Sequence, residues 1–192
     1  MDLPVVTYEK EEYVETASGN KICKKNTIAS NTIFGTQNII ISGKTIIQKD
    51  VILRGDLAVI RIGRYCIVQR GTIIRPSLKQ FVRKPTMFPV TIGDSVFVEE
   101  ECVINAAYIG SFVHVGARSV LGRACTIKEC CRVLPDSVVS ADAVFPPFST
   151  IGGNPARIVG QEPECTENLM VEATTMYYDN FVPSNLPKAS FA

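Results

Sequence analysis

The chain has 192 residues, of which 46% are hydrophobic and 20% charged, values that fit one folded domain and exclude a disordered chain. Lys plus Arg number 20 and Asp plus Glu 19, and the net charge of +1 excludes a global electrostatic attraction to nucleic acid or to an anionic membrane. A single histidine excludes a three-histidine metal site within one chain and leaves one residue for histidine-based acid–base chemistry.

The N-terminal residues do not follow the pattern of a secretion signal, and we expect none here. Asp2 and Pro4 stand where a signal peptide would have a positive region leading into an apolar stretch, and no apolar run approaches the ~20 residues that span a bilayer. We therefore expect a cytoplasmic protein without direct membrane insertion, whose seven cysteines stay reduced. Residues 1–27 are expected to lead into a repeat region that begins at residue 28.

Apolar residues recur at intervals of six along the chain. The spacing is loose over residues 28–59, where Ile40, Ile46 and Ile52 keep it, and it becomes regular at Ile62. The longest unbroken series consists of Ile109, Val115, Leu121, Ile127, Val133, Val139, Phe145 and Ile151. A smaller residue follows each of these after four positions, ending with Pro155.

A period of six fits neither an α-helix nor a simple hairpin sheet, but it fits a short strand followed by a corner, repeated. Each small residue stands two positions before the next large one, so both point inward, and stacked units bury a continuous core. We expect glycines such as Gly110 and Gly116 to absorb backbone strain at the corners. Four cysteines at the small position are then buried structural residues, with a metal site or a disulfide as the alternative: Cys66, Cys102, Cys125 and Cys131.

Residues 75–90 interrupt the repeat. This insertion contains four basic residues, no acidic residue and two phenylalanines. Such a loop either folds its aromatic side chains back onto the scaffold or protrudes and binds a partner protein. The candidate partner-binding residues are Lys79, Phe81, Arg83, Lys84 and Phe88.

One helix is predicted after the repeat, over residues 166–181. Thr166 suits the N-cap position, and Pro183 ends the pattern. We expect the helix to pack along the scaffold, with docking on a partner protein as the alternative. Its apolar positions recur at helical spacing: Leu169, Met170, Ala173, Met176, Tyr177 and Phe181.

The unbroken register from Ile109 to Ile151 resembles the hexapeptide-repeat family. The resemblance implies an all-β fold, a left-handed parallel β-helix with three strands per coil, over residues 28–158. Residues 75–90 would be an inserted loop, and residues 159–192 a C-terminal α-helix with a tail. The family geometry implies about six coils, and a spacing of ~4.8 Å between strands makes the prism roughly 30 Å long.

Two groups of enzymes share this repeat. Arg54 and Asp56 resemble an Arg-Gly-Asp turn of the γ-class carbonic anhydrases, whose metal is held by three histidines. The corresponding positions here are Arg75, Glu100 and Asn105, so the resemblance implies that metal chemistry is lost and that no cofactor is held. Arg54 and Asp56 are then expected to form a structural ion pair.

The second group is the hexapeptide-repeat acyltransferases, which use a histidine as general base. The candidate here is His114, which stands one residue before the inward Val115 and is therefore expected to point outward. No other acid–base set accompanies it in the repeat. An acyltransferase, or a degenerate carbonic-anhydrase-like homotrimer, remains the alternative function.

Segments both inside and outside the repeat narrow the resemblance further. YVETASGNK (13–21), SGKTII (42–47), VEEECVINAA (98–107) and PECT (163–166) are similar to the β-helix subunits at the pointed end of dynactin, the activator of the dynein motor. This family implies a non-catalytic structural role that supports dynein-driven attachment and transport of cargo such as early endosomes. The implied partners are dynactin's other β-helix subunit, its actin-related pointed-end protein, its large zinc-containing subunit and dynein cargo adaptors.

Overall fold

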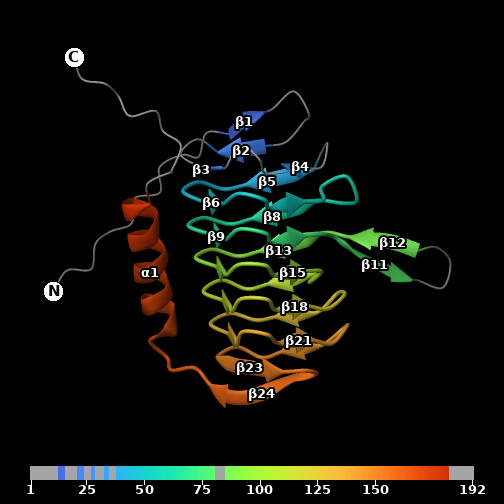
Figure 1. The fold of residues 1–192 in the computed structure, drawn as a ribbon, viewed down its shortest axis with the longest axis vertical. Helices are drawn as coiled ribbons and strands as arrows, with labels where there is room; N and C mark the ends of the chain where they lie inside the picture. Colours follow the sequence, from blue (N-terminus) through green and yellow to red (C-terminus); the bar gives the residue numbers. More distant parts are fainter. Residues whose placement is uncertain are drawn as a thin grey trace.

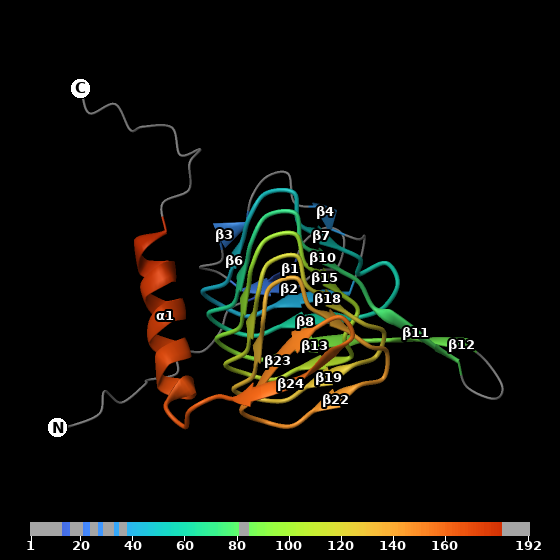
Figure 2. The same ribbon diagram turned by 60° about the horizontal axis from the view of Figure 1, so that its bottom comes forward.

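The computed structural model describes residues 13–15, 21–23, 27–28, 33–34, 38–80 and 85–181. Their backbone winds into stacked three-sided coils, a parallel β-solenoid of about six turns (Figures 1 and 2). A single helix in the described part of the chain, α1 (Thr166–Asn180), runs along one side of the coils (Figure 1). The expected all-β solenoid with one C-terminal helix is confirmed.

Each coil contributes strands to three sheets. Sheet A contains β1 (Tyr13–Glu15), β2 (Lys21–Cys23), β5 (Ile39–Ile41), β8 (Ile60–Ile62), β13 (Val90–Ile92), β16 (Tyr108–Ile109), β19 (Thr126–Ile127) and β22 (Val144–Phe145). Sheet B contains β3 (Thr27–Ile28), β6 (Ile46–Ile47), β9 (Ile67–Val68), β14 (Phe97–Val98), β17 (His114–Val115), β20 (Arg132–Val133), β23 (Ser149–Gly153) and β24 (Ala156–Gln161). Sheet C contains β4 (Ile33–Phe34), β7 (Ile52–Leu53), β10 (Ile73–Ile74), β15 (Val103–Ile104), β18 (Val120–Leu121) and β21 (Val138–Val139). Pairing within these three sheets is parallel except between β1 and β2 and between β23 and β24. Because β2 pairs with β5, sheet A begins upstream of residue 28, where the repeat region was expected to start.

The interior of the coils is filled by the six-residue repeat. All eight large residues of the series from Ile109 to Ile151 are buried, the most exposed being Phe145 at 7%. They are stacked by the register of the strands; Ile109, for example, pairs with Ile127 on the next coil. The predicted core of this part of the chain is confirmed: large and small inward residues alternate and are buried along the axis of the coils.

In the early coils the predicted register is wrong by one residue. The inward residues are Ile41, Ile47 and Leu53, which pair with Ile62, Val68 and Ile74 of the following coil. Ile40, Ile46 and Ile52, which were expected to face inward, stand outside this core cluster. The strands here carry apolar residues on both faces, and a shift of one residue exchanges the two faces of a strand.

The corner glycines serve a different purpose from the expected one. Left-handed φ angles occur instead at residues immediately before the small inward position, for example Arg118 at 54° and Ala124 at 54°. Gly110 has no left-handed φ, but a Cβ there would stand 2.6 Å from the backbone nitrogen of Glu129 on the next coil. Glycine is therefore required because adjacent coils approach each other closely.

The C-terminal end of the coils departs from the repeat. Pro155, expected at a small inward position, is exposed in the turn between β23 and β24. The chain reverses there, and β24 pairs antiparallel with β23 from Ser149 to Gly153. The strand therefore extends beyond residue 158, where the repeat was expected to close.

The helix lies where it was predicted, but with a different face toward the scaffold. Leu169 and Met176, expected to pack on the coils, are 55% and 56% exposed, whereas Thr174 is buried and Tyr177 is half-buried. Thr166 is the first helical residue, preceded by the N-cap Cys165, and its hydroxyl donates to the carbonyl of Pro163 at 2.6 Å. None of the described residues forms a helix long and apolar enough to cross a membrane.

Candidate interaction surfaces

The three positions that correspond to metal ligands in γ-class carbonic anhydrases do not form one cluster. Arg75 and Asn105 follow paired residues of β10 and β15 and so occupy the same corner of adjacent coils. Glu100 follows β14 on another sheet, and its Oε2 lies 2.6 Å from Nε of Arg70. Across the described residues, no three His, Cys, Asp or Glu side chains are grouped so that they could hold a metal ion.

Arg54 and Asp56 form a two-point ion pair at a corner of an early coil. Nε of Arg54 donates to Oδ1 of Asp56 at 2.9 Å, and its Nη2 donates to Oδ2 at 2.8 Å. The hydrogen bond from Arg54 lowers the pKa of Asp56 below its ordinary value. Both side chains are substantially exposed, so this pair orders the turn between β7 and β8 and contributes little to overall stability.

The outer face of sheet B is covered by α1. The first residues of successive strands stack here, and Ile46 and Ile67 are 1% and 0% exposed although they stand outside the core cluster. Tyr177 of α1 lies on the same face, with its ring centroid 5.4 Å from that of Phe97 and its hydroxyl accepting a hydrogen bond from Nε2 of Gln48 at 2.8 Å. The helix therefore buries a second apolar layer outside the coils, and its packing along the scaffold is confirmed.

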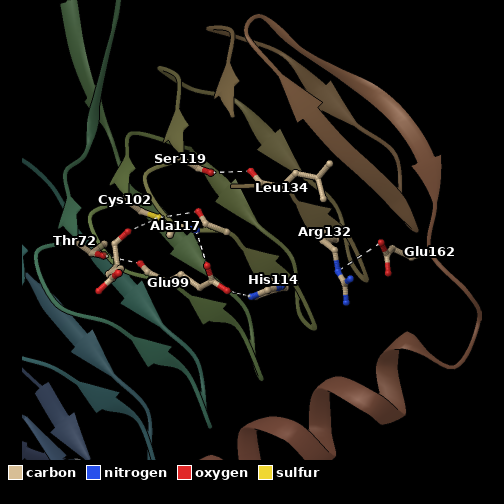
Figure 3. A network of polar contacts seen from close by, with 11 residues as sticks. Thr72, Glu99, Cys102, His114, Ala117, Ser119, Arg132, Leu134 and Glu162 are labelled. Atoms are coloured by element: carbon tan, nitrogen blue, oxygen red, sulfur yellow. Dashed lines mark hydrogen bonds and ion pairs between the residues drawn. The ribbon is translucent and has the colours of Figure 1, made fainter. Parts of the chain in front are cut away.

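His114 lies on this face next to Phe97, and it is paired with Glu99. Its Nε2 is 3.0 Å from Oε1 of Glu99, while Oε2 accepts the backbone N–H of Ala117 at 2.7 Å (Figure 3). Burial lowers the pKa of His114 below its ordinary value, and the charge of Glu99 opposes this shift. A carboxylate only accepts hydrogen bonds, so Nε2 carries the proton.

A second polar contact anchors the segment that leads into α1. Glu162 accepts a hydrogen bond from the hydroxyl of Thr150 at 2.7 Å. Its Oε1 also lies 3.7 Å from Nε of Arg132 (Figure 3). Arg132 occupies the position next to His114 in the ladder of sheet B. The polar residues of this face therefore hold the linker and the helix onto the coils.

The Glu99–His114 pair was not predicted from the sequence. The expectation that His114 points outward is correct, but Glu99, 15 residues earlier, was not recognised as its partner. The spacing of about one coil is the signal that could have found it, because one short repeat unit places Phe97 opposite His114. The pair then needs the helix above it to become partly buried, which no local pattern indicates.

The insertion at residues 75–90 contains an antiparallel hairpin, β11 (Ser77–Gln80) and β12 (Pro85–Phe88). The hairpin projects from the prism (Figures 1 and 2). Leu78 pairs with Met87 across it and is 46% exposed, and Phe88 is half-buried. Among the other candidate residues, Lys79 belongs to β11, its side chain lying outside the described part, and Phe81, Arg83 and Lys84 lie outside the described residues.

The cysteines at the small inward positions are buried structural residues, as predicted. The thiol of Cys66 donates to the carbonyl of Gly93 at 3.1 Å. Burial raises the pKa of Cys66 and Cys125 to about 12 and that of Cys102 to about 11. These thiols and that of Cys131 are free, and the thiols with raised pKa values stay protonated near neutral pH.

Comparison with known proteins adds sequence and fold relatives. A family model described as dynactin subunit 5 matches residues 1–186. A protein from Dictyostelium discoideum, also named dynactin subunit 5, is 42% identical over 177 residues, covering 92% of this chain and 87% of the relative.

Solved structures show the same architecture in bacterial proteins. A hexapeptide transferase family protein from Anaplasma phagocytophilum superposes with a TM-score of 0.62 and 18% identity, covering 84% of this chain and 91% of that one. A mutant of AntD, an N-acyltransferase from Bacillus cereus, superposes with a TM-score of 0.58 and 16% sequence identity, covering 81% of this chain and 88% of that one. At these identities the likeness concerns the fold alone, and it confirms the left-handed hexapeptide-repeat β-helix.

Proposed function

Because the chain belongs to the dynactin subunit 5 family, and is therefore a dynactin subunit, we propose that it is a non-catalytic structural component of the pointed-end complex. The observation that carries this proposal is the match of the family model to residues 1–186, which includes the non-repeat ends as well as the coils. The proposed location is the cytoplasm, in association with the cytoskeleton.

The chemistry of the described side chains supports a role without catalysis. The sole histidine of the chain, His114, is held by Glu99 on the face under α1, and its side chain is only 28% exposed. The buried thiols have raised pKa values and are poor nucleophiles. Arg75 places a positive charge where a γ-class carbonic anhydrase has a metal ligand, which disfavours a cation at that corner.

The proposed role is to support dynein-driven attachment of cargo such as early endosomes and its transport along microtubules. A stacked β-helix is a stiff prism that can hold other proteins at fixed positions. The proposed neighbours are dynactin's other β-helix subunit, its actin-related pointed-end protein and its large zinc-containing subunit, with dynein cargo adaptors as transient partners.

The hairpin of the insertion is the proposed contact for an adaptor or cargo protein. It projects from the prism and exposes Leu78, and the candidate residues Lys79, Phe81, Arg83, Lys84 and Phe88 add positive charge and aromatic surface. Charge reversal at Lys79, Arg83 and Lys84 should weaken adaptor binding at least about tenfold. Unchanged affinity would remove the hairpin from the interface.

The proposed function is tested by purifying the chain from cells at physiological salt with a tag that does not disturb assembly. Recovery in a dynactin-sized complex with the actin-related protein, the second β-helix subunit and dynein subunits is expected. Recovery as a homotrimer alone would overturn the proposal. The fold neighbours are transferases, so turnover of acetyl-CoA by the pure chain tests the alternative; none is expected.

A further inference from the structure

The last strand of the solenoid has one edge without a partner. β24 (Ala156–Gln161) stands at the end of sheet B, pairs with β23 on one side, and has no described strand on the other. Figure 1 places it beyond β23, at the C-terminal end of the prism, whereas α1 runs along the side of the coils. The helix therefore leaves this edge uncovered.

This edge lacks the devices that usually prevent strand pairing. Natural edges are blocked by proline, by charged side chains or by a covering element. Pro155 and Pro163 lie just outside the strand, and residues 158–161 (IVGQ) contain neither proline nor charge. Arg157 is the single charged residue of β24, and its Nη1 donates to its neighbour's carbonyl, that of Ala156, at 2.9 Å.

The side chains of the strand extend the same surface. Ile158 is 54% exposed and Val159 is 60% exposed. Neighbouring residues of a strand point to opposite faces, so apolar side chains are exposed on both faces of β24. Leu134 lies nearby, since it and Val159 are the side chains closest to where a Cβ on Gly152 would stand. The unpaired main-chain groups of β24 and its exposed apolar side chains together suit a partner that is an extended strand rather than a helix.

We propose that β24 pairs with an extended strand of a neighbouring dynactin subunit, which continues sheet B across the subunit boundary. The inference rests on the proposed function, because a free monomer with such an edge would be prone to self-association, whereas a permanent partner in an assembly would cover it. The added strand supplies backbone N–H and C=O groups to β24, and apolar side chains that contact Ile158 and Val159.

Hydrogen exchange distinguishes main-chain pairing from side-chain contact. We would compare the purified chain with the same chain inside purified dynactin. The amides of β24 that point away from β23 should exchange at least about tenfold more slowly in the complex, because new backbone hydrogen bonds protect them. The amides already bonded to β23 serve as an internal reference. Equal exchange in both samples would overturn the inference.

A pair of lysine variants supplies the second test. Val159→Lys should reduce incorporation into dynactin at least about tenfold in competition with the wild-type chain, because a buried lysine opposes strand addition. Val144→Lys is the matched control, since Val144 is 65% exposed on β22 of the last coil in sheet A. Both variants should keep the wild-type melting temperature within about 2 °C.

The outcomes separate the inference from the function on which it rests. If the wild-type chain itself fails to enter dynactin, the proposed function fails. If Val159→Lys assembles as well as the wild type, the pairing of β24 alone is overturned. Sedimentation of the isolated chain as a dimer that Val159→Lys dissolves would assign the edge to a second copy and also overturn the inference.

Discussion

His114 and Glu99 join two neighbouring coils on the face that α1 covers. Nε2 of the histidine lies 3.0 Å from one carboxylate oxygen, and the other oxygen accepts the N–H of Ala117 at 2.7 Å. The ring of Phe97 contacts both the imidazole and Tyr177 of the helix. This pair therefore links the strand ladder of sheet B to the seating of α1.

The stability of the protein should depend on this histidine between pH 7 and 5. Burial lowers the pKa of His114 below 6.5, so the unfolded chain takes up the proton at a higher pH than the folded chain. Stability is then complete above about pH 6.5 and falls as the pH drops toward the lowered folded pKa. The urea midpoint should decrease over this range in the wild type.

The variant His114→Gln should show a flatter profile over the same range, since the chain has no other histidine. Arg54 lowers the pKa of Asp56, and Arg118 lowers that of Asp136. Protonation of these two carboxylates therefore changes the stability only below about pH 4. Circular dichroism at each urea concentration provides the measurement. An unchanged slope in the variant would mean that His114 does not set the dependence.

Gly110 should tolerate no side chain. A Cβ there would stand 2.6 Å from the backbone nitrogen of Glu129, so Gly110→Ala should reduce the free energy of unfolding by about 1–3 kcal/mol through overpacking between coils. Gly160→Ala is the control, because its nearest neighbour, the Thr150 side chain, would be 3.5 Å away. Chemical denaturation compares the two; equal stability would contradict the close-approach argument.

Two adjacent helix residues should differ sharply when changed to alanine. Tyr177 contacts Phe97 and Gln48, so Tyr177→Ala should cost about 2–3 kcal/mol, whereas the exposed Met176 should change stability by under about 0.5 kcal/mol. The Tyr177 variant should also bind a hydrophobic dye more strongly, because Ile46 and Ile67 become accessible. Similar losses for both variants would show that the helix packs through another face.

One described thiol should react quickly with a maleimide. Cys165 is exposed, whereas the other described cysteines are buried, and the pKa of Cys66 is raised to about 12 by burial. In a Cys23→Ser background at pH 7.5, we expect one equivalent of rapid labelling, which Cys165→Ser abolishes, and labelling of the rest on unfolding. Rapid labelling of two or more sites in the folded protein would contradict the buried positions.

The sequence alone determined the solenoid from residue 109 to residue 151. Large and small residues alternate there in an unbroken period of six, and several outward residues, such as His114, Thr126 and Arg132, are polar, so the pattern specifies both the period and the inward face. In the early coils the two residues of a strand such as Ile46–Ile47 are equally apolar. The six-residue spacing of these coils was predicted correctly, but which residue of each strand faces inward became clear only from the structure, where Ile47 pairs with Val68.

The tertiary structure decided the environments that depend on distant segments. Leu169 and Tyr177 both fit the helical pattern, yet only Tyr177 reaches the coils, where it bonds with Gln48, 129 residues away. Likewise, His114 could be placed outside the prism from its position in the repeat, but its burial requires α1, and its partner Glu99 requires the stacking of coils. Local periodicity records which side of a strand is apolar, whereas contacts between remote segments arise only when the coils and the helix are assembled in space.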